Sequence, residues 1–197
     1  MREIPESLLS AVLDLTPRLL GLHQSKQTPV VLIDGRAGSG KSTFARLLQD
    51  LVFQETKQSP KVIHMDDLYP DWEGLAQGSM YLVGQILKPL KLAGKAHWQR
   101  WDWTNDKRGG PDPGNGWREF DGQNRLIVEG CGSVTEQSKE LADLTIWIEA
   151  DRETRKERFE ARDRGVFSNF WNSWSAQEDE FFQEQRSEQL CQLTVKN

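Results

Sequence analysis

Short apolar runs alternate with amphipathic stretches along most of this chain of 197 residues. Each apolar run is rich in β-branched side chains and is bounded by glycine, proline or charged residues, which is typical of buried strands. The predicted strands are TPVVLID (28–34), KVIHM (61–65), NRLIVEG (124–130) and LTIWIEA (144–150). Because strands that alternate with helices form a parallel sheet covered on both faces, the pattern predicts an α/β fold.

Apolar residues at helical spacing predict the helices that accompany these strands. The stretch KSTFARLLQDLVFQ (41–54) places Phe44, Leu47, Leu48 and Leu51 on one helical face. Residues 1–25 resemble an amphipathic helix, and residues 151–165 form a highly charged one that ends near a glycine. We therefore expect one domain over residues 1–197, in which a parallel sheet of about five strands lies between two helical layers.

The alternation of strands and helices breaks between about residues 70 and 123, where only MYLVGQILKPLKL (80–92) has a helical pattern. The remainder is rich in glycine, proline and aspartate, which predicts long loops. A loop of this length in a compact domain is usually functional or disordered. Its tryptophans argue against disorder because they need partners that bury them, so we expect a substrate-binding insertion here.

Aromatic residues are unusually frequent, with eight tryptophans in the chain. The C-terminal segment 166–197 carries aromatic residues at roughly helical spacing, which indicates a helix packed in the core or at an interface rather than ligand stacking. These residues are Phe167, Phe170, Trp171, Trp174, Phe181 and Phe182. For the tryptophans of the insertion, packing and stacking on a planar substrate remain equally open.

Composition narrows the classes of partner. The formal net charge of −5 argues against a broad nucleic-acid surface, since phosphate backbones require a basic footprint. No apolar run approaches the length of a membrane span, and the start lacks the features of a signal peptide. The two cysteines, Cys131 and Cys191, form no metal-binding pair. We expect a cytoplasmic protein that binds neither nucleic acid nor membrane.

The strongest chemical signal is GRAGSGKS, which matches GxxxxGK[ST] between a predicted strand and a predicted helix. Glycines let the backbone N–H groups of such a loop turn toward phosphate oxygens, and the following helix N-terminus favours an anion. Lys41 would reach the terminal phosphates, and Ser42 would bind Mg²⁺. The predicted nucleotide-binding residues are Gly35, Ala37, Gly38, Ser39, Gly40, Lys41, Ser42 and Thr43. The expected architecture is the P-loop NTPase three-layer sandwich, with ATP and Mg²⁺ as cofactors.

Acidic residues follow two other predicted strands. A P-loop enzyme places a further carboxylate near its metal ion, usually at a strand end, where ligands of parallel sheets gather. Glu129 follows LIV, and the pair Asp66 and Asp67 follows VIHM. One member of the pair could serve only as a helix cap or turn residue. The predicted metal ligands are Ser42, Glu129 and Asp66.

In the order of its motifs, the chain resembles the uridine kinase, phosphoribulokinase and pantothenate kinase group over roughly residues 28–165, and uridine kinases in particular. MDDLY resembles the Q-D-S-F-Y stretch of that group, which implies that Asp66 is the general base and that Tyr69 contacts the substrate. VEGCGS resembles the segment whose glutamate helps to hold Mg²⁺. TRKERFEARD (154–163) resembles the lid whose arginines touch the transferring phosphate, which implies roles for Arg158 and Arg162.

RWDW (100–103) resembles the Y-D-F segment that lines the nucleoside pocket of these kinases, which makes Trp103 a candidate acceptor contact. Asp102 and Arg108 are the polar residues of this irregular region that we expect to contact the acceptor. Two departures concern the part that reads the base. Tryptophans replace the tyrosine and phenylalanine, and the histidine that follows this segment in uridine kinases is missing. In the lid, Phe159 replaces an arginine. These departures affect the identity of the acceptor more than kinase activity.

Three functions follow from these observations. The first is ATP-dependent phosphorylation of a nucleoside or a related small alcohol. The second is a kinase for a nucleotide, a sugar or a vitamin precursor, and the third is an ATP-dependent switch or binding protein. No Asn-Lys-x-Asp motif for reading guanine is present, and the acid pair with the arginine-rich helix favours transfer over switching. The spare aromatic residues leave a homodimer open.

Overall fold

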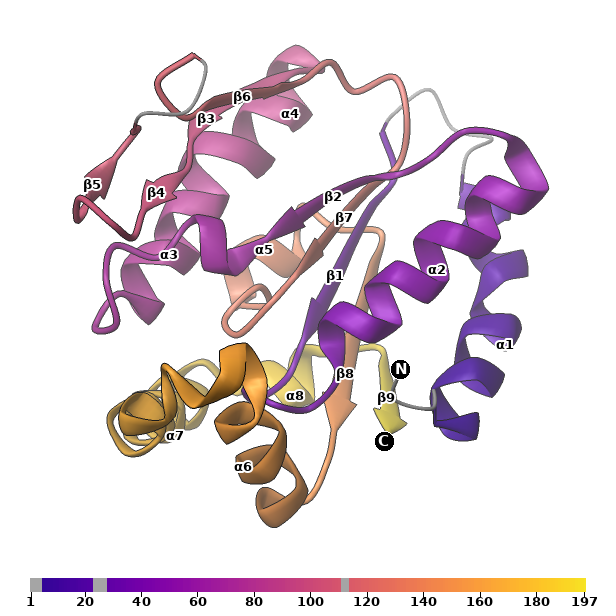
Figure 1. Cartoon of the computed structure of the whole chain (residues 1–197). Helices are drawn as coiled ribbons and strands as arrows, with labels where there is room; N and C mark the ends of the chain where they lie inside the picture. Colours follow the sequence, from indigo (N-terminus) through magenta and orange to yellow (C-terminus); the bar gives the residue numbers. More distant parts are fainter. Residues whose placement is uncertain (1–4, 23–27, 111–113) are drawn as a thin grey trace.

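The computed structural model describes residues 5–22, 28–110 and 114–197 (Figure 1). A sheet of five parallel strands forms its centre, in the order β2-β7-β1-β8-β9. The strands are β1 (Val30–Asp34), β2 (Lys61–His64), β7 (Leu126–Glu129), β8 (Leu144–Glu149) and β9 (Leu193–Lys196). The predicted α/β fold with a parallel sheet of about five strands is confirmed.

Helices cover both faces of this sheet. The α-helices are α1 (Glu6–Leu22), α2 (Lys41–Thr56), α3 (Leu75–Tyr81), α4 (Lys88–Ala93), α5 (Glu136–Lys139), α6 (Arg152–Glu160), α7 (Trp171–Gln185) and α8 (Ser187–Leu190). Short helical turns are η1 (Met65–Asp67), η3 (Arg162–Gly165) and η4 (Ser168–Phe170), and a π-helix, η2 (Leu82–Leu87), joins α3 to α4. In Figure 1, α1 and α2 lie together on one side of the strands, opposite α3 and α4.

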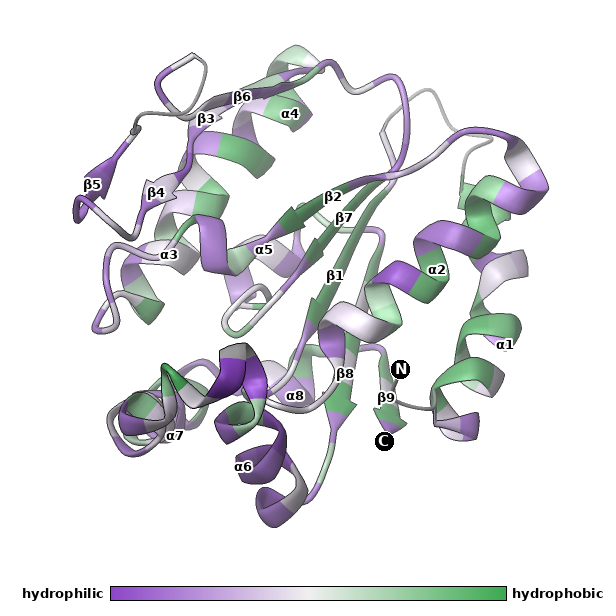
Figure 2. Cartoon of the chain, in the orientation of Figure 1, coloured by the Kyte–Doolittle hydropathy of each residue, from purple (hydrophilic) through white to green (hydrophobic). Residues whose placement is uncertain are grey.

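Alternation along the strands divides the apolar core into two clusters. Val31 and Ile33 of β1 pack with residues of α1 and α2, whereas Val30 and Leu32 pack with the helices of the other face. Successive side chains of a strand point to opposite faces, so one short apolar run supplies both clusters. Figure 2 shows the central strands in the hydrophobic colour and α6 in the hydrophilic one.

The fifth strand comes from a place where the sequence predicted a helix. Residues 166–197 do form α7 and α8, but Leu193–Lys196 forms β9, which pairs in parallel with β8. The helical prediction is therefore wrong for this last stretch. The run LTVK is short, and only its pairing with the exposed edge of β8 decides its conformation.

The insertion also contains strands that we predicted as loops. Strand β3 (Ala96–Gln99) pairs antiparallel with β6 (Trp117–Phe120), and β4 (Trp101–Asp102) pairs with β5 (Lys107–Arg108). These strands are too short to produce a clear alternating pattern between the glycines and aspartates. Residues 111–113 of the predicted insertion lie outside the described residues.

The two remaining predicted helices are shorter than expected. Helix α1 spans Glu6–Leu22, and residues 1–4 and 23–25 of its predicted range lie outside the described residues. Helix α6 begins after Asp151, which accepts a hydrogen bond from the backbone N–H of Thr154 (2.9 Å) as an N-cap. It ends at Glu160, and η3 completes the predicted lid. Within residues 5–22, 28–110 and 114–197, no helix is long and apolar enough to cross a membrane.

Candidate active site

The phosphate loop, residues 35–40, connects the end of β1 to the first residue of α2. Gly35, Gly38 and Gly40 have φ angles of 142°, 79° and 104°, which only glycine adopts readily. A Cβ atom on Gly38 would lie 2.2 Å from the Arg155 carbonyl oxygen, so another residue could not fit there. The predicted strand, loop and helix are thus present in the arrangement that directs loop N–H groups to an anion.

Lys41 is buried at the start of α2 and lies among acidic groups. Its Nζ donates to the Arg36 carbonyl oxygen (2.9 Å) and to Cys131 Sγ (3.5 Å). Burial lowers the pKa of the Lys41 ammonium, but the surrounding acidic side chains raise it more, and the net shift is upward. The ammonium therefore keeps its charge in the position that the motif predicts for a phosphate contact.

Ser42 and Glu129 form an oxygen-rich corner beside the loop. The Ser42 hydroxyl donates to Glu129 Oε1 at 3.0 Å, and Glu129 is buried at the end of β7. His64, at the end of β2, places its Nδ1 2.5 Å from the same oxygen. This hydrogen bond to Glu129 raises the pKa of His64, although burial opposes the shift. Hydroxyl and carboxylate oxygens are suitable ligands for Mg²⁺, which prefers few protein ligands together with phosphate oxygens.

Asp66 and Asp67 lie in η1, directly after β2, and both line the same cavity as the phosphate loop. Asp66 Oδ2 accepts a hydrogen bond from Arg162 Nη2 at 2.7 Å. Asp67 is more enclosed and lies 3.7 Å from Arg100 Nη1, and its burial raises the pKa of its carboxyl group. The structure thus brings both candidate bases to the cavity. The two differ in their partners, because Asp66 binds Arg162 and Asp67 lies near Arg100.

Two arginines of the predicted lid, Arg155 and Arg158, contact the phosphate loop, whereas Arg162 is exposed and binds Asp66. Arg155 is buried, donating to the Ala150 carbonyl (3.1 Å) and the Ala37 carbonyl (3.4 Å). Arg158 Nη1 donates to the Gly38 carbonyl oxygen at 3.4 Å. Arg158 and Arg162 both line the cavity.

One cavity of about 920 Å³ joins these groups. This volume is at the upper end of the range of small-molecule sites, which is about 300–1,000 Å³. The phosphate loop and the start of α2 line it through Ala37, Gly38, Gly40, Lys41, Ser42 and Thr43. Of the predicted nucleotide-binding residues, Gly35 and Ser39 do not line it.

Aromatic side chains form a second part of the cavity lining. We call this set the aromatic wall, and its members are Trp72, Trp103, Phe159, Phe167 and Trp174. Trp72 is at its centre, since its ring lies 5.4 Å from Trp103, 5.3 Å from Phe167 and 5.9 Å from Trp174. Phe167 and Trp174 of the predicted C-terminal segment pack on Trp72, as expected for packing aromatics, and they also line the cavity.

Two of the four predicted acceptor contacts line the cavity. Trp103 does so, and its Nε1 donates to the Asp66 carbonyl oxygen at 2.9 Å. Tyr69 also lines it, but its ring is buried and its hydroxyl donates to the Cys131 carbonyl oxygen at 2.8 Å.

Asp102 and Arg108 are not among the cavity residues. Asp102 accepts hydrogen bonds from Thr104 and Asn105 in an exposed turn. The Arg108 guanidinium lies 3.4 Å from the centroid of the Tyr81 ring and donates to the Leu68 carbonyl oxygen at 2.9 Å. Their contacts support the insertion itself.

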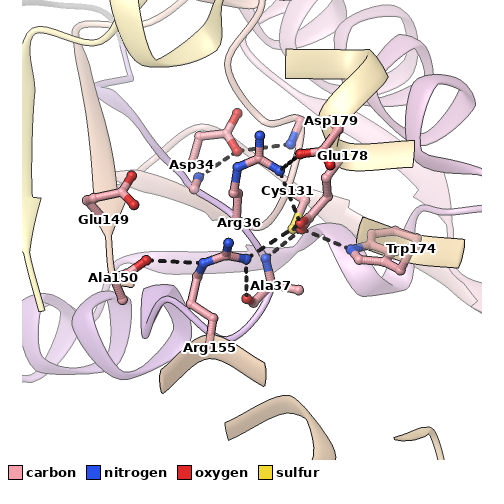
Figure 3. Close-up of polar contacts among 12 residues, drawn as sticks. Asp34, Arg36, Ala37, Cys131, Glu149, Ala150, Arg155, Trp174, Glu178 and Asp179 are labelled. Carbon is pink, nitrogen blue, oxygen red and sulfur yellow. Dashed lines mark hydrogen bonds and ion pairs between the residues drawn. The ribbon is translucent and has the colours of Figure 1, made fainter. Parts of the chain in front are cut away.

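Buried acidic residues beneath the loop were missed by the sequence analysis. Asp34, the last residue of β1, is fully buried and accepts hydrogen bonds from the backbone N–H groups of Gly35, Gly132 and Val134. Burial raises the pKa of Asp34 to about 7, although these hydrogen bonds oppose the shift. Glu178 of α7 is also fully buried, and its carboxylate reaches the phosphate loop at Ala37 (Figure 3). In the sequence, only the position of Asp34 at the end of a predicted strand could have indicated a functional acid. The position of Glu178 in the middle of a helix gives no such indication.

No protein-family model matches the chain, and no curated protein sequence matches it. Solved structures do match. A protein of Bacillus stearothermophilus described as a possible uridine kinase is 18% identical, with a TM-score of 0.66 over 95% of this chain and 98% of that one. A protein of Silicibacter sp. TM1040, described as a candidate fructose transport system kinase, is 18% identical, with a TM-score of 0.58 over 91% and 98%.

A third structure, of the YGR205w protein, is 12% identical, with a TM-score of 0.54 over 98% of this chain and 94% of that one. All three likenesses extend over nearly the whole of both chains. At these identities they establish the architecture and leave the acceptor open. The chain has the fold of the uridine kinase-like P-loop kinases, as the order of its motifs indicated.

Proposed function

We propose that the chain transfers a phosphoryl group from ATP to a hydroxyl group of a small metabolite, as a nucleoside kinase or a kinase of a related alcohol. The observation that carries this proposal is the single cavity that joins Lys41 and the phosphate loop to Asp66 and the aromatic wall. Such a cavity has room for a donor at one end and for an acceptor at the other. The fold shared with uridine kinase-like proteins supports the same assignment.

The proposed reaction uses Asp66 as the general base. Its carboxylate takes the proton from the acceptor hydroxyl while that oxygen bonds to the γ-phosphorus, and the bond from the γ-phosphorus to the bridging oxygen breaks and releases ADP. Lys41, Arg158 and Arg162 would stabilise the negative charge of the transferred group. Arg162 is hydrogen-bonded to one of the two carboxylate oxygens of Asp66, Oδ2, so this contact can persist while the other oxygen takes the proton.

Mg²⁺ fits the corner formed by Ser42 and Glu129, where a hydroxyl and a buried carboxylate lie 3.0 Å apart beside the phosphate loop. Asp66 is the third predicted ligand, and it shares the same cavity. A bound Mg²⁺ would neutralise phosphate charge. His64 would hold Glu129 in place through its hydrogen bond to Oε1.

The aromatic wall favours an acceptor with a flat ring next to its hydroxyl, since ring faces stack favourably on indole and phenyl groups. A nucleoside satisfies this requirement, and so does a heteroaromatic vitamin precursor. The missing base-reading histidine weakens the case for uridine itself. A sugar without a ring system of this kind would leave the apolar wall unused.

The test is a screen for acceptor-dependent ADP release with Mg²⁺·ATP and a panel of nucleosides, heteroaromatic alcohols and sugars. We expect strong stimulation by a ring-bearing alcohol. Asp66→Asn should lower acceptor-dependent turnover by about 10²–10⁴-fold, the usual contribution of a general base, and leave ATP affinity unchanged.

Asp67→Asn is the matched variant, because it removes the same charge one residue further along. If Asp67→Asn abolishes turnover and Asp66→Asn does not, the base is Asp67. If no small alcohol stimulates ADP release but a macromolecule does, the protein is a switch and not a kinase.

A further inference from the structure

The carboxylate of Glu178 is wholly enclosed between α7 and the phosphate loop (Figure 3). Glu178 Oε1 accepts hydrogen bonds from the Ala37 backbone N–H at 2.5 Å, from Trp174 Nε1 at 3.1 Å and from Cys131 Sγ at 3.1 Å. Burial raises the pKa of the Cys131 thiol well above its usual value, so the thiol keeps the proton that it donates. Three donors from three separate segments therefore converge on one oxygen.

The location of this charge is unusual for a residue whose only role is packing. Burying an ionised carboxylate is unfavourable unless cations and donors compensate, and an apolar side chain would fill the same space at no electrostatic cost. Here two guanidinium groups, Arg36 Nη1 and Arg155 Nη1, each lie 3.9 Å from Glu178 Oε2. The chain thus assembles a set of cations around an acid that lies at the edge of a predicted phosphate site.

The partners of Glu178 belong to both ends of the cavity. Ala37 is part of the phosphate loop, and Cys131 is in turn 3.5 Å from the Lys41 ammonium. Trp174 belongs to the aromatic wall, and its ring packs edge-on against Tyr69, with 5.0 Å between ring centroids. One carboxylate is therefore bonded directly to a residue of the phosphate loop and to a ring of the aromatic wall.

We propose that Glu178 is a positioning residue for phosphoryl transfer, which fixes the phosphate loop and the aromatic wall relative to each other. This inference rests on the function proposed above. The reacting atoms of donor and acceptor come from opposite ends of the cavity, and small misplacements between them slow a reaction strongly. Glu178 itself touches neither ligand in this scheme and acts through Ala37 and Trp174.

The test compares Glu178→Gln with Asp179→Asn. Gln has the shape of Glu but cannot bind the two guanidinium groups and the three donors together. Asp179 is the matched control, since it carries the same charge one residue later and binds Arg36 from an exposed position. We expect Glu178→Gln to lower acceptor-dependent kcat about 10- to 100-fold, with the KM for ATP within about threefold. Asp179→Asn should leave both within about twofold.

A second measurement does not depend on turnover. Hydrogen exchange in a peptide that contains residues 35–40 should become faster by about tenfold in Glu178→Gln, because the Ala37 N–H loses its charged acceptor, and should stay unchanged in Asp179→Asn. Glu178→Asp, whose shorter side chain cannot reach Ala37 and Trp174 at once, should behave like Glu178→Gln and serves where the latter does not fold.

Three results would overturn the inference. Loop exchange at the wild-type rate in folded Glu178→Gln would show that the carboxylate does not hold the loop. A fall in kcat that merely follows the fraction of molecules able to bind Mg²⁺·ADP would reduce Glu178 to a folding role. A rise in the KM for ATP with constant kcat would make it a ligand-binding residue. If the wild type shows no acceptor-dependent turnover, the proposed function fails. Hydrogen exchange of residues 35–40 and Mg²⁺·ADP binding would still test whether Glu178 fixes the phosphate loop.

Discussion

The phosphate-loop end and the aromatic end of the cavity are built in different ways. At the first end, backbone N–H groups and charged side chains come from residues 35–42 and from one strand end, Glu129. At the second end, ring surfaces dominate, and Trp72, Trp103 and Trp174 come from three distant segments. The first end is thus local in sequence and polar, and the second is assembled by the fold and apolar.

This difference suggests how the two ends divide their tasks. A phosphate donor presents the same charged groups to every enzyme that uses it, so a short, rigid loop of fixed conformation is sufficient to bind it. Acceptors differ in shape from one kinase to another, and a wall made of separate side chains can be adapted to them by substituting one aromatic residue at a time. Changes at the loop should therefore abolish every reaction, whereas changes at the wall should affect the acceptor alone.

The largest effect is expected from Lys41→Met, which removes the buried ammonium group proposed to bind the terminal phosphates. Turnover with any acceptor should fall by about 10³-fold, as when one preorganised charge-stabilising group is lost. The free energy of unfolding should also fall by about 3 kcal/mol, because Asp34, Glu129 and Glu178 lose a buried countercharge. ADP-release assays and urea titrations measure the two quantities.

Lys156→Met is the control for Lys41→Met, since Lys156 forms an exposed ion pair with Glu160 at 3.7 Å. Both turnover and the free energy of unfolding should stay near the wild-type values, within about 0.5 kcal/mol for the latter. Wild-type turnover in Lys41→Met would contradict the assignment of residues 35–42 as the donor site and would remove the basis of the comparison.

A smaller and more selective effect is expected from Trp72→Ala, which removes the centre of the aromatic wall. The kcat/KM for the acceptor should fall by about 100-fold, while the KM for ATP stays within about twofold. The free energy of unfolding should fall by about 2 kcal/mol, since the half-buried ring packs on Phe170 at 4.2 Å between centroids. Steady-state kinetics with each substrate varied in turn separates the two ends.

Trp72→Phe should restore most of the acceptor kinetics because it keeps a ring at the same position. Trp117→Ala controls for the loss of an indole, since Trp117 is exposed and does not line the cavity. An equal loss of ATP and acceptor affinity in Trp72→Ala would show that the two ends are not separable, and that the aromatic wall supports the nucleotide as well.

The sequence predicted the phosphate-loop end almost completely. Hydrophobic run, glycine loop and helix start are adjacent in the chain, so the local pattern contains the loop itself, while Glu129 was found as an acid at the end of another predicted strand and the buried Asp34 and Glu178 were missed. The parallel sheet followed from the same alternation of strands and helices. Strand β9 was missed because four residues acquire their conformation from pairing with β8 and not from their own pattern.

The aromatic end was predictable only in part. Trp103 was named through its motif, but Trp72 is one of many tryptophans and nothing nearby distinguishes it. Glu178 lies among the glutamates and glutamines of a helix that was predicted to pack through its aromatic residues, and only the packing of α7 on the phosphate loop buries this glutamate. Long-range contacts of this kind depend on where helices dock, which periodicity does not specify. Asp102 and Arg108 were named as the polar contacts of the irregular region; they do not line the cavity, and their contact with an acceptor stays a prediction.

The smallest effect is expected from Arg108→Lys, which tests whether the acceptor site extends beyond the aromatic wall into the insertion. The Arg108 guanidinium stacks on Tyr81 and donates to the Leu68 and Gln99 carbonyl oxygens, at 2.9 and 3.4 Å. A lysine ammonium cannot reproduce both the stacking and the two directed hydrogen bonds, so the free energy of unfolding should fall by about 1 kcal/mol. Acceptor kcat/KM should stay within about twofold, because Arg108 does not line the cavity.

Lys107→Arg is the matched control for Arg108→Lys, since it exchanges the same two side-chain types at the neighbouring, exposed position of β5. It should change neither the stability nor the kinetics. A rise of about tenfold in the acceptor KM of Arg108→Lys, at unchanged stability, would return Arg108 to the acceptor site and extend that site beyond the aromatic wall into the insertion. The acceptor end would then share the charged character of the phosphate-loop end, and the contrast between a polar donor site and an apolar acceptor site would no longer hold.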